Sequence, residues 1–350
     1  MDGAKSMNRR ILKFIRKINN RLLDFSYDNR MTFVLGKPNG IMIEPYSKCN
    51  YNCPLCPSGL GILKRKKIAM SFDEFKRNLG FLKYTTEYIT LFHFGEPLLN
   101  KELYKMVEYC HKYNISTQIS TNGMLLTETL ARKLILAGLD RLIFSIDTYD
   151  SKIYTKYRVN GDYQTVINNI KMANKLKRKL KSDITIVAQY MIMNENEDIE
   201  MMKKHGRELG VDEVLIKTIG IGDSIEDYEK AKKFLPQNQE LSRYQQNTTH
   251  TKMNDFKCKY VWKRMVLCSD GVCLPCVRDQ RVDYVLGKCN NKNNLSKIWN
   301  SREYRKFRKQ VLNGINDIIM CDRCPEVLKY KLDPWVEIKK RKNCEDFKLK

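Results

Sequence analysis

Three cysteines lie on one short segment of this 350-residue chain, spaced C-x3-C-x2-C at Cys49, Cys53 and Cys56. They follow the apolar run 41–43, which predicts a strand with the cysteines on the loop at its carboxyl end. Three thiolates can hold three corners of a four-iron cluster and leave the fourth iron open, whereas clusters that only carry electrons usually have a fourth cysteine. A three-ligand zinc site, or thiols that bind nothing, are the alternatives, although this spacing is unusual for zinc.

Composition indicates a globular protein of a reducing compartment. Hydrophobic residues make up 42% of the chain, but no apolar run is long enough to span a membrane and no secretory signal is evident. Most of the 12 cysteines fall at 49–56, 258–289 and 321–324, which favours metal ligation over disulfides and predicts a cytoplasmic location. Cys110 and Cys344 lie outside these groups, and we expect them to be free thiols.

The formal net charge of +24 favours anionic partners, among them nucleic acid, a membrane surface, a phosphorylated substrate or an acidic redox protein. Basic residues are spread from Lys5 to Lys350 without a single patch, and aromatic-flanked RNA-binding signatures are absent. We therefore do not expect a nucleic-acid partner.

Residues 8–25 predict a basic amphipathic helix. Its apolar residues recur at helical spacing and are Ile11, Phe14, Ile15, Ile18, Leu22 and Phe25. Between them lie Arg9, Arg10, Lys13, Arg16, Lys17 and Arg21. We expect the apolar stripe to pack on the domain that follows, with peripheral contact to an anionic membrane as the alternative.

Residues 41–219 alternate between strand and helix patterns. Strands are predicted at 41–44, 88–94, 115–120, 141–146, 184–191 and 213–218. Helices are predicted from a capping box at Ser71 and at 100–113, 127–137, 164–180 and 198–209. This alternation predicts an α/β fold with a parallel sheet, and six units suit a partial barrel better than a closed one.

Polar residues follow four consecutive strands, where functional groups gather in such folds. The cysteines follow the first strand, Phe94-Gly95-Glu96-Pro97 the second, Ser120-Thr121-Asn122-Gly123 the third and Ser145-Ile146-Asp147 the fourth. A glycine lets backbone approach a ligand, a carboxylate can meet an amine, and short polar groups suit ribose hydroxyls. Together these groups outline one cofactor pocket. His93, at the end of the second strand, either faces this pocket or is an ordinary core histidine.

With these motifs, residues 41–220 resemble the radical S-adenosylmethionine (SAM) enzymes. The resemblance implies a partial (β/α)6 TIM-like barrel in which Cys49, Cys53 and Cys56 ligate a [4Fe–4S] cluster whose open iron binds SAM. It also implies a cofactor-binding set in which Gly95, Glu96 and Pro97 meet the methionine amino group and Arg158 its carboxylate, with Asn122, Ser145 and Asp147 completing the pocket. Two residues depart from the family pattern: Leu55 replaces an aromatic residue, and Phe94 replaces a glycine.

A second group of cysteine motifs begins at Cys258. Asp270-Gly271 between apolar runs predicts a hairpin, and the later motifs are Pro275-Cys276, Leu286-Gly287, Ile298-Trp299-Asn300-Ser301 and Cys321-x2-Cys324. This order resembles the SPASM extension of the same superfamily, and it implies an auxiliary [4Fe–4S] cluster on Cys258, Cys276, Cys321 and Cys324. Cys268, Cys273 and Cys289 are interpreted as small buried hydrophobes, with ligation of a second auxiliary cluster as the alternative. A zinc ribbon on Cys273, Cys276, Cys321 and Cys324 is a further alternative.

These features divide the chain into four parts. They are an N-terminal helix and linker (1–40), a radical SAM core (41–225), a connector (226–257), and a small cysteine-rich SPASM domain with a basic tail (258–350).

The resemblance implies that a low-potential donor such as a flavodoxin or ferredoxin reduces the first cluster. Cleavage of SAM then yields a 5′-deoxyadenosyl radical that takes hydrogen from the substrate, and the auxiliary cluster accepts an electron. We expect a small or carbohydrate-like substrate, because the 40 N-terminal residues are short for a peptide-binding domain. A peptide- or protein-modifying maturase is the alternative, and a non-catalytic iron–sulfur or zinc module is the hypothesis from another class.

Overall fold

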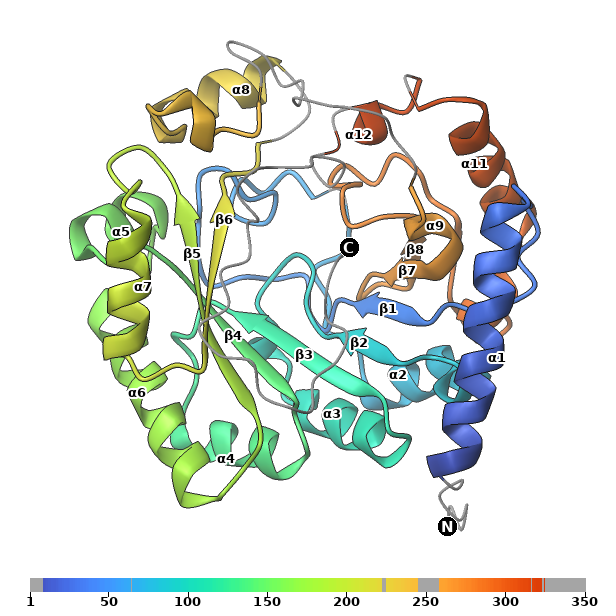
Figure 1. The fold of residues 1–350 in the computed structure, drawn as a ribbon, viewed down its shortest axis with the longest axis horizontal. Helices are drawn as coiled ribbons and strands as arrows, with labels where there is room; N and C mark the ends of the chain where they lie inside the picture. The colour runs from blue at the N-terminus through green and yellow to red at the C-terminus, as the bar shows by residue number, and fades with distance from the viewer. Residues whose placement is uncertain are drawn as a thin grey trace.

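A mostly parallel sheet organises the molecule (Figure 1). The computed structural model describes residues 9–63, 65–221, 225–244, 258–315, 317–322 and 324. Within them the strand order is β6-β5-β4-β3-β2-β1-β7-β8-β9. The first six strands pair in parallel in sequence order and are β1 (Gly40–Ile43), β2 (Tyr88–Thr90), β3 (Ser116–Thr121), β4 (Arg141–Asp147), β5 (Thr185–Ile192) and β6 (Glu213–Thr218). The predicted α/β partial barrel is confirmed.

Helices lie along the outer side of this curved sheet (Figure 1). They are α2 (Phe72–Leu79), α3 (Leu103–Lys112), α4 (Glu128–Leu136), α5 (Ser151–Tyr157), α6 (Tyr163–Lys179) and α7 (Ile199–Glu208). The predicted capping box at Ser71 is present, with its hydroxyl accepting from the Glu74 amide. The short helix α5 was not predicted, and β2 ends at Thr90 rather than at residue 94, so residues 91–96 form a loop.

The C-terminal strands extend the same sheet instead of forming a separate one. Strand β7 (Arg264–Leu267) pairs in parallel with β1, and β8 (Val272–Leu274) and β9 (Gly287–Lys288) follow in antiparallel order. The predicted hairpin at Asp270-Gly271 is confirmed, because Gly271 has φ +86 and its amide donates to the Cys268 carbonyl at 3.0 Å. The cysteine loop after β1 and the C-terminal hairpin therefore extend from neighbouring strands of one continuous sheet.

Shorter elements complete the described chain. The α-helices are α8 (Ile225–Ala231), α9 (Tyr260–Lys263), α10 (Leu295–Ile298), α11 (Arg302–Asn313) and α12 (Ile319–Asp322). The 3-10 turns are η1 (Gly80–Tyr84), η2 (Pro97–Leu99), η3 (Lys232–Phe234) and η4 (Gln239–Leu241). Residues 245–257 of the expected connector, His250 and Cys344 lie outside the described residues, as does the expected basic tail. No described helix is long and apolar enough to cross a bilayer.

The N-terminal helix α1 (Arg9–Asp28) corrects one expectation, because its apolar stripe faces outward. Its buried residues are Leu12, Arg16, Asn19, Leu23 and Ser26. Arg16 donates to the carbonyls of Tyr113 and Asn114 at 3.0 and 2.7 Å, beyond the end of α3. These carbonyls follow a helix C-terminus and have no intrahelical donor, so the guanidinium satisfies them and draws the polar side of α1 inward.

Arg308 on α11 joins three segments far apart in the sequence. Its fully buried guanidinium donates to the carbonyls of Val261 and Thr32, each at 3.0 Å, and to the Asn300 side chain at 3.1 Å. It also lies over the rings of Trp299 and Tyr304, at 4.4 and 4.1 Å from their centroids. Burial lowers the pKa of Arg308 to about 10, so the side chain stays charged at neutral pH.

We expect Arg308→Met to lower the free energy of unfolding by about 2–5 kcal/mol, because two buried carbonyls lose their donor. Chemical denaturation of the metal-free protein measures this change. Arg305→Met on the exposed side of the same helix is the control and should shift the midpoint little. Equal effects of the two substitutions would show that the Arg308 hydrogen bonds contribute nothing specific.

Candidate active site

The loop after β1 places two of its three cysteines, Cys49 and Cys53, within reach of hydrogen-bond donors. The Tyr51 amide donates to the Cys49 sulfur at 3.4 Å, and the Asn122 amide group lies 4.0 Å from the same atom. Arg158 donates to the Cys53 sulfur at 3.6 Å. Burial, together with the nearby Glu96, Cys56 and Cys53, raises the pKa of Cys49 to about 11, although the Tyr51 hydrogen bond opposes the shift. A bound metal centre would offset this cost of forming thiolates, and N–H groups directed at the sulfurs suit such ligands.

Residues 95–97, which follow β2, hold the cysteine loop in position through hydrogen bonds. The Glu96 amide donates to the Lys48 carbonyl at 2.9 Å, and Gly95, with φ +83, donates to the Ser58 hydroxyl at 2.9 Å. The buried Glu96 carboxylate accepts from the Thr121 hydroxyl at 2.6 Å and from two backbone amides, Asn122 at 2.9 Å and Leu98 at 3.0 Å. The carboxylate therefore fixes residues 95–97 against the end of β3.

Asp147 and Arg158 form a buried ion pair beside the same loop. The two side chains meet at 2.5 Å, and Asp147 is fully buried with φ +63 at a register shift in β4. Burial raises the pKa of Asp147, and the Arg158 charge opposes that shift. Asp147 Oδ1 and Arg158 Nε are buried without a hydrogen-bond partner among the described atoms, so both retain capacity for a polar ligand.

A polar row crosses the next three strands. The hydroxyls of Ser120 and Ser145 lie 3.1 Å apart, and the Gln189 amide donates to Ser145 at 3.3 Å. Gln189 on β5 was not among the predicted site residues. Its signal in the sequence is a single amide within the apolar stretch 184–191.

Glu44 is the second residue that the sequence-based prediction missed. Its fully buried carboxylate accepts from both terminal nitrogens of Arg65, at 2.9 and 2.8 Å, from the Ser269 hydroxyl at 2.9 Å, and from the amides of Phe94 and Ser269 at 3.3 Å. Arg65 also lies 3.5 Å from Asp270. Burial alone would raise the pKa of Glu44, but the Arg65 hydrogen bonds and charge bring it below its ordinary value.

The C-terminal cysteines also converge. Burial raises the pKa of Cys276 well above its ordinary value, and Cys324, Cys258 and Cys321 lie close enough to raise it further. Among the described residues, no three His, Cys, Asp or Glu side chains lie near enough to share a single metal ion. In a [4Fe–4S] cluster, by contrast, each cysteine binds a different iron. The ligand assignments at both sites remain predictions.

The remaining cysteines are buried free thiols in the part of the chain that the structure describes. Cys273 and Cys289 lie with their sulfurs 3.6 Å apart between β8 and the segment after β9. Cys268 lies near Glu44 and Arg65, and Cys110 is fully buried on α3. Their burial agrees with the interpretation of Cys268, Cys273 and Cys289 as small hydrophobes.

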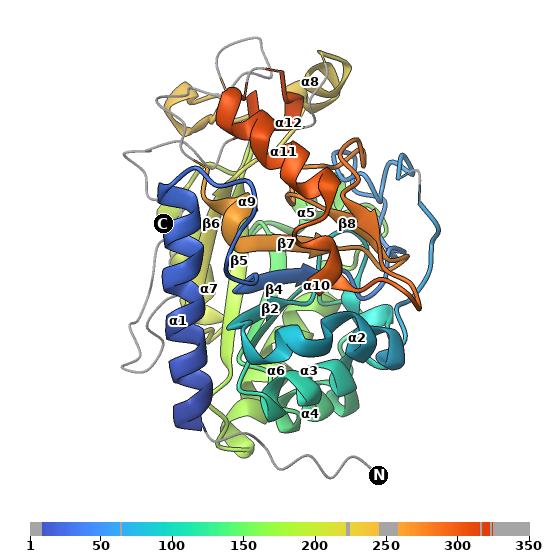
Figure 2. The ribbon, with the colours of Figure 1, turned by 90° about the vertical axis from the view of Figure 1, so that its right-hand side faces the viewer.

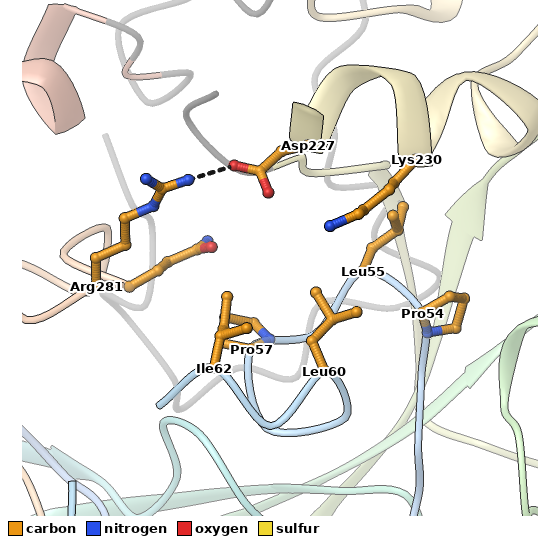
Figure 3. Close-up of a pocket in the computed structure, with 9 residues that line it drawn as sticks. Pro54, Leu55, Pro57, Leu60, Ile62, Asp227, Lys230 and Arg281 are labelled. Atoms are coloured by element: carbon orange, nitrogen blue, oxygen red, sulfur yellow. Dashed lines mark hydrogen bonds and ion pairs between the residues drawn. The ribbon is translucent and has the colours of Figure 1, made fainter. Parts of the chain in front are cut away.

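A pocket lies beside the third cysteine, between the loop 54–62, α8 and residues 280–281 (Figure 3). Pro54, Leu55, Pro57, Leu60 and Ile62 form its apolar wall. Opposite them are Lys230 and Arg281, the latter paired with Asp227 at 2.8 Å. Leu55, one of the two departures from the family pattern, therefore lines this pocket.

His93 lies next to the Glu44 group, and its ring nitrogen Nε2 is buried without a hydrogen-bond partner among the described atoms. Burial lowers the pKa of His93 to about 4, with Glu44 opposing and Arg65 adding to that shift. Between pH 6.5 and 4 the unfolded chain therefore binds a proton that folded His93 does not, so stability falls as the pH falls.

We expect His93→Gln to flatten this dependence. Relative to the variant, the wild type should lose up to about 3 kcal/mol of unfolding free energy between pH 6.5 and pH 4. Denaturant titrations of both proteins across this range measure the difference. Parallel pH profiles would show that the folded protein protonates His93 normally.

Two known protein families match this sequence. The sequence model described as the radical SAM superfamily matches residues 43–206, and the SPASM model, described as an iron–sulfur cluster-binding domain, matches residues 258–325. GTP 3′,8-cyclase of Lactiplantibacillus plantarum is 29% identical over 191 residues, which cover 52% of this chain and 55% of that protein. Several of the curated relatives are thus matched over about half of their length.

Two further similarities extend over most of the chain. The tungsten-containing aldehyde ferredoxin oxidoreductase cofactor-modifying protein of Pyrococcus furiosus is 24% identical over 332 residues, covering 84% of this chain and 91% of that protein. SuiB of Streptococcus suis, solved with bound S-adenosylmethionine, has a TM-score of 0.60 at 15% identity, covering 87% of this chain and 76% of SuiB, which shows a shared fold. The chain therefore belongs to the radical SAM superfamily and carries a SPASM domain, and these domains imply binding of S-adenosylmethionine and [4Fe–4S] clusters.

Proposed function

We propose that this enzyme is an oxidoreductase that removes hydrogen from a small, anionic or carbohydrate-like molecule, with the auxiliary cluster as electron acceptor. The observation that carries the proposal is the convergence of Cys49 and Cys53 with Asn122 and the Asp147–Arg158 pair. These groups come from the carboxyl ends of β1, β3 and β4, the edge at which parallel α/β folds assemble active sites.

The side chains at this edge suit the cofactors of the family. Cys49, Cys53 and Cys56 would hold the first cluster, and the unpartnered Asp147 Oδ1 and Arg158 Nε would bind polar groups of S-adenosylmethionine. When bound, cluster and cofactor supply an organic radical that abstracts hydrogen. The Glu96 carboxylate is hydrogen bonded to three protein donors, so we infer that it holds the loop 95–97 in place, and the acceptor capacity that remains on its two oxygens would meet the amino group of the cofactor.

The auxiliary site supports an electron-transfer role. Cys258, Cys276, Cys321 and Cys324 supply four thiols, and a cluster with four protein ligands has no open iron for a substrate. The pocket beside Cys56 supports a small polar substrate, because an apolar wall there faces Lys230 and Arg281, which are paired with Glu226 and Asp227. Charged groups above apolar surface fix the orientation of small ligands.

The test is anaerobic reconstitution, reduction and addition of S-adenosylmethionine. Wild type should release 5′-deoxyadenosine, and Cys53→Ser should release none. Cys276→Ser should retain uncoupled release but lose substrate oxidation, because only the acceptor is affected. Absence of 5′-deoxyadenosine from a fully reconstituted wild type would contradict the proposal.

Substrate class is tested with extracts from cells grown in heavy water. Hydrogen abstraction transfers deuterium from the substrate to 5′-deoxyadenosine, which mass spectrometry detects. We expect the label from the small-molecule fraction. Label from the peptide fraction alone would instead identify a peptide-modifying enzyme.

Gly95→Ala should reduce the iron held at the first site. A methyl group there would overlap the Tyr46 carbonyl oxygen and lie 2.8 Å from the Ser47 carbonyl carbon, so the cysteine loop must shift. Gly210→Ala is the matched control, since Gly210 has a similar φ of +71 but no atom within 4 Å of the added carbon. Iron analysis of both reconstituted variants measures the effect, and equal iron contents would show that the close approach is unimportant.

A further inference from the structure

Helix α1 presents an apolar stripe that no described segment covers. The stripe consists of Ile11, Phe14, Ile18, Leu22 and Phe25, with exposed fractions between 37% and 64%. Their spacing of three and four residues places them in one row along the helix. Phe33 and Leu35, 49% and 44% exposed, add further apolar surface in the segment that follows. A row of this size is unusual on protein surface that meets only water.

The helix is fixed to the domain by its other side. Asn19 exchanges two hydrogen bonds with the backbone of Lys37, at 2.7 and 2.8 Å, in addition to the Arg16 contacts with Tyr113 and Asn114. Leu12 and Leu23 are buried beside them. Helix α1 lies along one edge of the molecule (Figure 1, Figure 2). These contacts therefore hold the exposed stripe in a fixed outward orientation.

A basic row runs next to the stripe. Arg10, Lys13, Lys17 and Arg21 follow one another at four- and three-residue spacing, and each is exposed. Lys13, Lys17 and Arg21 also line a groove that α1 forms with Glu87, Asn114 and Ser116. Apolar residues with phenylalanine on one face, beside lysine and arginine on the next, are typical of helices that lie in the plane of a membrane surface.

Charge argues against two other partners for the stripe, which are a second copy of this chain and its own C-terminal residues 325–350. A second copy of the chain would bring two basic rows together, since a twofold interface places the same patch on both sides. The C-terminal residues 325–350 carry eight lysines and arginines against five acidic residues, so they are basic as well. An anionic surface is complementary to the row, and the net charge of +24 strengthens the attraction.

We propose that α1 docks the enzyme on an anionic lipid bilayer, with the apolar stripe at the boundary of the acyl chains and the row Arg10, Lys13, Lys17 and Arg21 among lipid headgroups. The sheet and its active-site edge stay outside the bilayer, so docking concentrates the enzyme at the membrane without changing its chemistry. The proposal does not depend on the substrate or reaction proposed above.

Flotation of the reconstituted protein with lipid vesicles tests this proposal. The protein should float with vesicles of equal parts phosphatidylcholine and phosphatidylglycerol, and much less with phosphatidylcholine alone. Each of Phe14→Gln and Phe25→Gln should weaken binding about tenfold, because each removes a large apolar side chain from the interface. Leu136→Gln is the matched control, since Leu136 is 68% exposed on α4, away from the stripe.

The basic row is tested separately. Replacing Lys13, Lys17 and Arg21 together by Gln should weaken binding to the anionic vesicles by roughly fivefold per charge at low salt. Release of 5′-deoxyadenosine in the absence of vesicles should be unchanged in all these variants.

Three outcomes would overturn the proposal. The wild type does not float with anionic vesicles; the phenylalanine variants float as well as wild type; or the stripe covers a protein partner. In the last case Phe14→Gln would convert a dimer to a monomer, or weaken binding of a flavodoxin, without any effect on vesicle binding.

Discussion

The buried carboxylate of Glu44 joins three segments that meet at the carboxyl edge of the sheet, where the candidate active site lies. It receives hydrogen bonds from Arg65 after the cysteine loop, from Phe94 after β2, and from Ser269 on the C-terminal hairpin. Removing a carboxylate from water is costly unless charge and hydrogen bonds replace its hydration, and here five contacts to its two oxygens do so. Loss of any one segment would leave part of this charge unsatisfied, so the three segments are held in one arrangement.

Strand pairing explains why such a contact can form across 225 residues of chain. Strands β1 and β7 are parallel and in register, with Ile43 opposite Leu267, so both end at the same edge of the sheet. The next residues, Glu44 and the Cys268–Ser269 segment, must then lie side by side, and the Glu44 amide donates to the Leu267 carbonyl at 2.8 Å. The parallel pairing thus fixes the cysteine loop against the hairpin of the SPASM domain.

Sequence patterns correctly predicted the features that depend on residues close together in the chain. The apolar runs, the Ser71 capping box and the Asp270-Gly271 turn each contain their own signal, and the strands end within a few residues of their predicted positions. Tertiary partners could not be predicted this way. Gln189 became notable only when β5 placed it beside Ser145, and Glu44 only when Arg65 and Ser269 met it. The pairing of Asp147 with Arg158 likewise depends on the unpredicted helix α5, which returns the chain toward the cysteine loop.

Helix α1 shows why periodicity alone cannot assign a buried face. The 3.6-residue pattern correctly identified an amphipathic helix, but the side that docks was decided by polar groups elsewhere. The carbonyls of Tyr113 and Asn114 need donors, and Lys37 offers both a donor and an acceptor, so Arg16 and Asn19 gain more by turning inward than the phenylalanines do. Within the described fold, the outward stripe therefore contributes little hydrophobic stabilisation. Because that stabilisation is gained only when another apolar phase covers the stripe, the orientation of α1 itself argues for an external partner.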